Sequence, residues 1–162
     1  MKITRCQVNH LTDPLGYQMG KPVFSWVTEA ASGKKQTAAR LRIFADRAQS
    51  VCLHDTGWAQ LNPLAEQVDL ALKPRTQYFW TVCVRSDADE KAESGLNSFE
   101  TGKMEETWQG KWITCDNAEP RLPVFHKAFD LTGKTPACAR LYICGLGLYE
   151  AVINGQRVSD EH

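Results

Sequence analysis

One stretch of alternating residues, 72–85, constrains the fold of this chain more than any other. From Tyr78 to Arg85 bulky apolar residues recur at every second position, which is the pattern of a β-strand, because successive side chains point to opposite sides of the backbone. One face holds Tyr78, Trp80, Val82 and Val84, and the other Phe79, Thr81, Cys83 and Arg85. Pro74 cannot donate to a ladder, so a turn should precede this strand. The stretch predicts the central strand of a sandwich core.

Short strands separated by turns are predicted through the rest of the first hundred residues. They are expected at residues 3–8, 22–27, 36–45, 50–54, 67–72 and 96–101. Residues 12–21 are predicted to be a loop, 29–35 a turn and 87–95 a charged hairpin loop. About seven short strands with no convincing 3.6-residue period are typical of an immunoglobulin-like sandwich.

Two of these strands carry specific predictions of orientation. Phe24 and Trp26 should share one face of the second strand. In the third strand, inward positions are expected at Ala39, Leu41, Ile43 and Ala45, and outward positions at Arg40 and Arg42. The two-residue alternation favours a strand here over a helix.

The balance of charge limits the partners to be expected. The chain has 162 residues, with 19 Lys and Arg against 19 Asp and Glu, so its net charge is zero. A nucleic-acid or anionic membrane partner would call for an excess of basic residues, so neither is expected. No window approaches the roughly 18 apolar residues of a spanning helix, and the first residues lack the apolar segment of a signal peptide. As written, the sequence predicts a cytoplasmic location.

Six cysteines, at positions 6, 52, 83, 115, 138 and 144, are even in number but lie far apart. They form no Cys-x-x-Cys pair and no cluster with histidine, so neither a metal site nor any other cofactor is predicted. Free, half-buried thiols acting as small apolar side chains are expected instead of disulfides.

A composition shift marks a second region. Residues 102–110 are polar, with Glu105 and Glu106, and Trp108 and Trp112 flank the junction. Beyond it, strands are predicted at 124–131, 139–144 and 149–153, with residues 156–158 returning after the hairpin turn Asn154-Gly155. The predicted domains are therefore 1–103 and 104–162.

The carboxylates do not predict a catalytic site. They lie in turns, at Asp87, Asp89, Glu90, Glu105, Glu106, Asp116 and Glu119. Solvated turn residues are the expectation for such positions. The first three could ligate calcium, but their spacing lacks the twelve-residue binding loop. Glu150 is expected to form a surface cross-strand pair.

Other motifs are equally uninformative about chemistry. Gly145-Leu-Gly147 has no third glycine and precedes a strand pattern, so it is not a dinucleotide fingerprint. The four histidines lack ligand spacing, and no serine lies in a Gly-x-Ser-x-Gly elbow. Trp26 and Trp80 are assigned to the core and Trp108 and Trp112 to the junction, which leaves Trp58 as the candidate for stacking on a sugar. No catalytic, cofactor-binding or metal-binding residue is predicted.

Two stretches of the sequence resemble known protein families. The run Leu72, Pro74, Thr76, Tyr78, Trp80 and Val82, with Trp26, resembles the region around the tyrosine corner of fibronectin type III domains over residues 3–102. Residues 139–158 resemble the second module of bacterial α-L-rhamnosidases, which are inverting glycoside hydrolases. Further matches in the family's order are Pro22 to Trp26, Gln36, Ala38, Asp55, Gly57, Phe99 to Gly102, Trp108, Trp112 and Ile113. Ala39 and Cys144 depart from the family's usual residues.

The resemblance implies an all-β chain, a fibronectin-like sandwich followed by part of a jelly-roll module. It also implies a non-catalytic role beside a downstream catalytic barrel, whose acid pair this chain lacks. A carbohydrate-binding module for rhamnose-containing glycans and a protein-interaction domain remain alternatives. Because a jelly roll needs about eight strands, we also expect the chain to be part of a longer protein.

Overall fold

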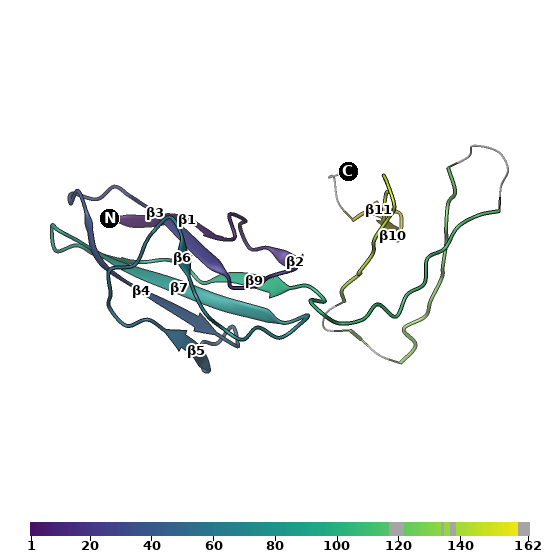
Figure 1. The fold of residues 1–162 in the computed structure, drawn as a ribbon, viewed down its shortest axis with the longest axis horizontal. Coiled ribbons are helices and arrows are strands. Elements are labelled where there is room, and N and C mark those ends of the chain that lie inside the picture. The colour runs from purple at the N-terminus through teal and green to yellow at the C-terminus, as the bar shows by residue number, and fades with distance from the viewer. Residues whose placement is uncertain (117–121, 134, 137–138, 159–162) are drawn as a thin grey trace. The chain divides into compact units, whose positions relative to one another are not determined.

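The computed structural model describes residues 1–116, 122–133, 135–136 and 139–158 (Figure 1). Over these ranges the chain forms strands, turns and loops without a helix, which confirms the all-β prediction. It divides into two compact units, Met1–Lys111 and Trp112–His162. The described part of the chain offers no helix that could cross a membrane.

The first unit is a sandwich of two sheets. Its strands are β1 (Lys2–Val8), β2 (Leu15–Tyr17), β3 (Val23–Glu29), β4 (Gln36–Phe44), β5 (Cys52–Asp55), β6 (Glu66–Gln67), β7 (Gln77–Ser86), β8 (Lys91–Glu93) and β9 (Asn97–Thr101). One sheet has the order β1-β3-β6, and the other the order β2-β9-β7-β4-β5 with β8 also paired to β7. All pairs are antiparallel except β2–β9, which is parallel.

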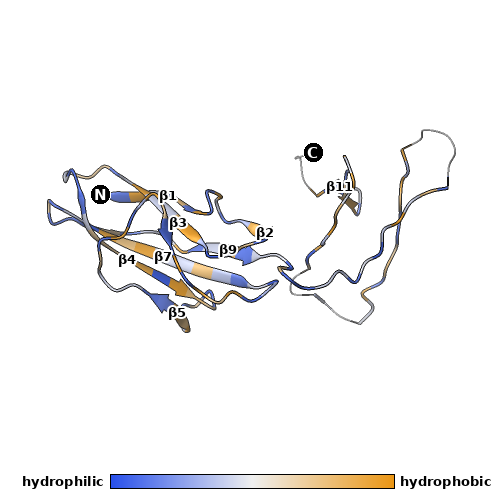
Figure 2. Cartoon of the chain, viewed as in Figure 1, coloured by the Kyte–Doolittle hydropathy of each residue, from blue (hydrophilic) through white to orange (hydrophobic). Residues whose placement is uncertain are grey.

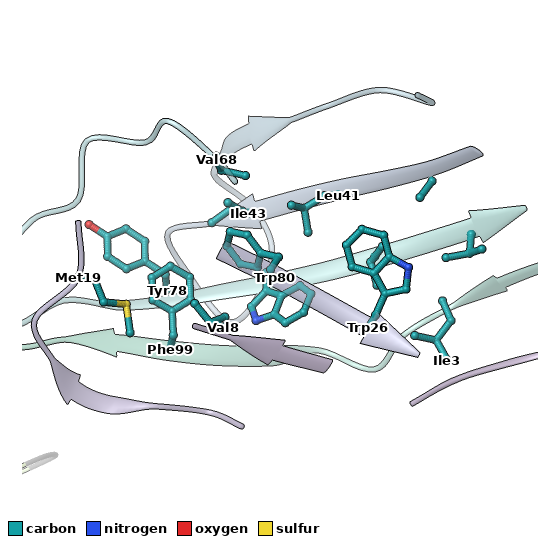
Figure 3. Packing of buried hydrophobic residues seen from close by; sticks show 14 residues of the cluster. Ile3, Val8, Met19, Trp26, Leu41, Ile43, Val68, Tyr78, Trp80 and Phe99 are labelled. Carbon is teal, nitrogen blue, oxygen red and sulfur yellow. The ribbon is translucent and has the colours of Figure 1, made fainter. Parts of the chain in front are cut away.

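Aromatic side chains from both sheets fill the core (Figure 3). Trp26 of β3 is 2% exposed and Trp80 of β7 is fully buried, as the sequence predicts. Phe24 packs edge-on against Trp80 at 4.9 Å between ring centroids and against Phe99 at 5.9 Å. Hydrophobic residues concentrate along β3, β4 and β7, the strands that line this core (Figure 2). Burial of such rings is the main stabilising contribution to a small sandwich.

A tyrosine corner leads the chain into β7. The backbone N–H of Lys73 donates to the Tyr78 hydroxyl at 2.8 Å, while the Tyr78 ring stacks on Phe99 at 5.2 Å. Thr101, which is fully buried, donates its hydroxyl to the Lys73 carbonyl at 2.6 Å and accepts from the Thr76 N–H at 3.0 Å. The polar groups of the turn are therefore satisfied from inside the sandwich, which confirms the predicted turn before the central strand.

Strand β7 departs from the prediction in one respect. Phe79, Thr81 and Cys83, assigned to its outward face, are only 4–7% exposed. β7 lies between β4 on one side and β8 and β9 on the other, so its outward side chains are flanked by side chains of strands on both sides. On the adjacent strand β4, the Arg42 guanidinium lies 5.6 Å from the centroid of the Phe44 ring. Long basic side chains can shield apolar surface with their methylene groups while the charge stays in water.

Smaller corrections concern strand ends. Ala45 is exposed and Phe44 is buried, the reverse of the predicted alternation, because β4 ends at Phe44 and its register with β5 shifts there. The predicted loop at 12–21 contains β2, and the hairpin loop at 87–95 contains β8. The strand predicted at 67–72 is reduced to β6 (Glu66–Gln67). In each of these cases the extent of pairing with another strand decides where the strand lies, and local composition does not reveal it.

In the second unit, β10 (Val152–Ile153) and β11 (Gln156–Arg157) form the predicted hairpin. Asn154 and Gly155 have φ values of 52° and 80°, as a type I′ turn requires. The strands predicted at 124–131 and 139–144 are wrong: their residues are described but pair with no other strand. An alternating pattern supplies an apolar face, yet a strand also needs a ladder partner. Phe129 is consequently 74% exposed and Ile143 48% exposed.

Candidate functional site

Two carboxylates of the acidic loop between β7 and β8 accept hydrogen bonds from the backbone of the neighbouring turn, residues 32–35, and we call this set of contacts the clamp. Asp87 accepts hydrogen bonds from the backbone N–H groups of Lys34 and Lys35 at 2.8 and 3.2 Å. Glu90 accepts from those of Ser32 and Gly33 at 2.9 and 3.2 Å. These backbone donors, Gly33 foremost, lower the pKa of Glu90, to which the Met1 amino group 3.4 Å away contributes. The two carboxylates therefore act on the fold of this turn.

The next acidic pair is also tied to neighbouring turns. Glu106 forms a two-pronged ion pair with Arg75, with N–O distances of 2.7 and 3.0 Å. Glu105 accepts from the Gln18 side chain at 3.1 Å. Arg75 lies in the turn of the tyrosine corner, so this contact fastens the segment after β9 to the entrance of β7. Asp116 is exposed, and Glu119 lies outside the described residues.

The described residues include no group of three His, Cys, Asp or Glu side chains that could hold a metal ion. Five cysteines are free. Cys83 is buried and Cys6 and Cys115 are half-buried, but Cys52 and Cys144 are exposed, contrary to the expectation for all six. Burial raises the pKa of Cys6 and Cys83, so these two thiols are held in the unreactive protonated form. Cys138 lies outside the described residues.

The glycines at 145 and 147 have a packing explanation. A Cβ on Gly145 would lie 2.5 Å from the Tyr149 ring, so this position accommodates the ring. No helix follows Gly147, whose φ is 107°. A dinucleotide site places its pyrophosphate at a helix N-terminus, and this geometry does not provide one.

Trp58 lies on the outer face of the six-stranded sheet. The backbone bridge between Ala39 and Ala59 holds it at the edge of β4. In the next row of the ladder Ala38 pairs with Arg85, and Arg85 pairs with Lys91 of β8. The guanidinium carbon of Arg85 lies 4.1 Å from the Trp58 ring centroid, and the Lys91 ammonium 5.6 Å from it. We call these three side chains, Trp58, Arg85 and Lys91, the Trp58 cluster.

The charge of this cluster differs from that of its neighbours. Arg40 donates to Asp55 at 2.8 Å, and Arg42 donates to Glu93 at 2.6 Å. The hydrogen bond from Arg40 holds the pKa of Asp55 at about 2. Arg85 and Lys91 are exposed and have no carboxylate partner among the residues that the structure describes. The cluster therefore carries two uncompensated positive charges around one indole ring.

The remaining candidates are distributed as follows. Glu150 pairs with Arg157 at 2.8 Å across the hairpin, which confirms the predicted surface pair. Trp108 and Trp112, assigned from sequence to the junction, are 53% and 68% exposed, and the Lys103 ammonium lies 5.2 Å from the Trp108 ring. Sequence reasoning singled out Trp58 but missed its two cations, because only the pairing of β4 with β7 and of β7 with β8 brings them beside it.

Comparison with known families gives two matches. The family described as "Rha78A-like, N-terminal immunoglobulin domain" matches residues 3–105, which is most of the first unit. The family described as "Alpha-L-rhamnosidase N-terminal domain" matches residues 134–162.

Two of the similar proteins carry the name Alpha-L-rhamnosidase. One from Formosa agariphila is 28% identical, and the match covers 96% of this chain and 19% of that protein. One from Streptomyces avermitilis is 33% identical over 71% of this chain and 12% of its own length. The chain thus spans about a fifth or less of the relatives it matches.

Two solved structures of alpha-L-rhamnosidases are also similar to this chain. The Streptomyces avermitilis alpha-L-rhamnosidase complexed with L-rhamnose matches with a TM-score of 0.63 and 30% identity, over 70% of this chain and 12% of that one. The alpha-L-rhamnosidase from Dictyoglumus thermophilum matches with a TM-score of 0.61 and 30% identity, over 69% and 14%. Both likenesses concern a small portion of a much larger enzyme.

Proposed function

Since the chain belongs to the family of Rha78A-like N-terminal immunoglobulin domains, we propose that it is a non-catalytic β-sandwich portion of an α-L-rhamnosidase-like glycoside hydrolase. It would support or position a catalytic domain carried elsewhere in the longer protein. The observation that carries this proposal is the coverage: nearly the whole chain aligns with a relative of which it represents 19%.

The contacts of the acidic residues support a non-catalytic role. An inverting glycosidase holds two carboxyl groups roughly 6.5 to 9.5 Å apart, facing a cleft. Here Asp87 and Glu90 are committed to backbone N–H groups of a turn, and Asp55 and Glu106 to arginines. Each of these four carboxylates is therefore held by a structural partner within the fold.

The second unit supports the idea of a longer protein. Large apolar side chains remain exposed along it, including Leu122 at 95%, Val124 at 92% and Leu148 at 91%. Exposed apolar side chains in such number mark surfaces that other protein segments cover. We propose that residues which follow in the longer protein complete this unit as a jelly-roll module.

Activity measurements test the proposal. The purified chain should release no aryl alcohol from an aryl α-L-rhamnoside, whereas the longer protein encoded by the continuous reading frame should do so. Deleting residues 1–103 from that longer protein should lower its melting temperature or its kcat without altering its acid and base residues. Turnover by the isolated chain, or a reading frame that encodes no further domain, would overturn the proposal.

A second candidate function, a carbohydrate-binding module, is favoured by one observation, the Trp58 cluster on the open sheet face. Calorimetric titration with rhamnose-containing glycans separates it from a purely supporting role. Heat of binding favours the module. No binding favours support of the catalytic domain or a protein-interaction domain.

A further inference from the structure

We propose that the Trp58 cluster is a binding site for the carboxylate of an acidic saccharide, a sugar chain that contains uronic acid. This inference goes beyond the supporting role proposed above and does not depend on it, because it rests on the geometry of one sheet face. The first step is the charge. Arg85 and Lys91 occupy paired positions on β7 and β8, so backbone pairing holds the two cations side by side.

The second step is that internal carboxylates do not neutralise this pair. Arg40 and Arg42, two basic residues of the adjacent strand β4, are already paired with Asp55 and Glu93. Each of those arginines has its charge balanced within the sheet, whereas Arg85 and Lys91 have no such partner among the residues described. An incoming anion therefore competes with water alone for the two side chains.

The third step is preorganisation. The Trp58 ring, 4.1 Å from the Arg85 guanidinium carbon, restricts the rotamers of that long side chain. A guanidinium held on an aromatic ring keeps its planar set of donors pointed outward, and this set fits a carboxylate with two parallel hydrogen bonds. Part of the conformational entropy of the Arg85 side chain is therefore lost before the ligand binds, which lowers the entropic cost of binding. Ala38, which lies beside Arg85 in the ladder, is too small to obstruct the ring or the ligand.

The size of the cluster favours a saccharide over a protein partner. Specific protein interfaces bury about 800 Å² on each side and carry some 20–30 residues. The Trp58 cluster is only three side chains, bordered by the closed ion pairs of Arg40 and Arg42. One carboxylate would lie between the two cations, and the sugar ring that carries it would contact the part of the half-exposed indole that the Arg85 guanidinium does not cover.

The test uses the full chain, labelled with ¹⁵N, and trigalacturonate as the probe. Titration should shift the indole N–H resonance of Trp58, assigned by its loss in Trp58→Phe. Arg85→Gln should lower the association constant at least fivefold, and Lys91→Gln at least twofold. Arg47→Gln, which removes an exposed arginine elsewhere, is the matched control and should change it less than 1.5-fold. An unchanged Trp80 indole resonance shows that each variant is folded.

Two further probes make the result decisive. The methyl ester of trigalacturonate keeps the sugar rings but loses the charge, and should bind at least tenfold more weakly. Inorganic sulfate should also bind more weakly than trigalacturonate. The proposal is overturned if trigalacturonate leaves the Trp58 resonance unmoved or binds Arg85→Gln as it binds the parent chain. Equal binding of sulfate, or tighter binding of a polyglutamate peptide, overturns it in favour of a plain anion site or an acidic protein partner.

Discussion

The Lys73 backbone N–H and the Tyr78 hydroxyl, five residues apart, are joined by a 2.8 Å hydrogen bond across the turn that enters β7. Tyr78 is 3% exposed, so little water is at hand to replace its hydroxyl. Tyr78→Phe should lower the free energy of unfolding by about 1–3 kcal/mol, because it leaves a partly buried donor unpaired. Urea unfolding followed by tryptophan fluorescence measures this. Tyr17→Phe, at a residue 49% exposed, should cost less than about 0.5 kcal/mol; equal losses for the two variants would show that the corner bond is not the cause.

Gly33 is predicted to resist substitution for lack of space. A Cβ there would lie 2.5 Å from Asp87 Oδ1 and 2.7 Å from Ser86 Oγ, within the clamp that holds the turn. Gly33→Ala should therefore destabilise the sandwich by about 1–3 kcal/mol through overpacking. Gly95→Ala is the control, since nothing lies within 4 Å of its added Cβ. If thermal unfolding shows Gly33→Ala to be as stable as Gly95→Ala, the clamp moves freely and the argument is wrong.

The ion pair of Arg40 with Asp55 predicts a pH dependence. The pKa of Asp55 is about 2 in the folded chain, below its ordinary value near 3.9. A lowered carboxyl pKa contributes stability that is complete above about pH 5 and is lost as the pH falls through 2. Asp55→Asn should therefore cost about 0.5–1 kcal/mol at pH 7, a modest figure because both side chains are about one-third exposed.

Chemical denaturation at pH 7, 4 and 2.5 checks this prediction. The difference between the parent chain and Asp55→Asn should shrink across that range. Asp69→Asn breaks a far more exposed pair with Lys21 and should cost less at pH 7. A gap for Asp55→Asn that stays constant down to pH 2.5 would contradict the assignment.

Limited proteolysis should distinguish the two units. The aromatic residues of the second unit are accessible, with Phe125 at 52% and Phe129 at 74% exposed, whereas Tyr78 and Trp80 are buried in paired strands. Chymotrypsin should therefore cut first within residues 112–158 and leave a resistant fragment of about residues 1–111, identified by mass spectrometry. Trypsin should give the same order, which excludes an effect of cleavage specificity. Early cleavage at Tyr78 would contradict the described packing.

The sequence was sufficient to predict those parts of the fold that depend on local alternation. β7, the core positions of Trp26 and Trp80, and the Asn154-Gly155 hairpin all follow from the spacing of a few side chains. β2 and β8 did not, because they occur in polar, glycine-containing segments and exist through pairing with β9 and β7. Residues 124–131 are the opposite case: they alternate strongly in sequence but form no strand, because they have no partner strand to pair with in the described part of the chain.

The Trp58 cluster shows the same limit for a site. Trp58 could be noticed from the sequence once the other tryptophans were assigned. Arg85 is 27 positions later and reaches the ring only because β4, β7 and β8 adjoin in one sheet. A site assembled across three strands leaves no spacing motif, so its prediction requires the register of each pair.

The parallel pairing of β2 with β9 has a consequence for the order in which the sandwich is completed. β1 and β3, or β4 and β5, are near neighbours in the chain and can pair as soon as they are synthesised. β2 finds its partner only at the far end of the unit, where Leu15 pairs with Glu100. Contacts between such distant positions form slowly, because a long loop must close first. During synthesis, residues 15–17 can pair only after residues 97–101 have emerged, so we expect the pairing of β2 with β9 to be among the last steps in the folding of this unit.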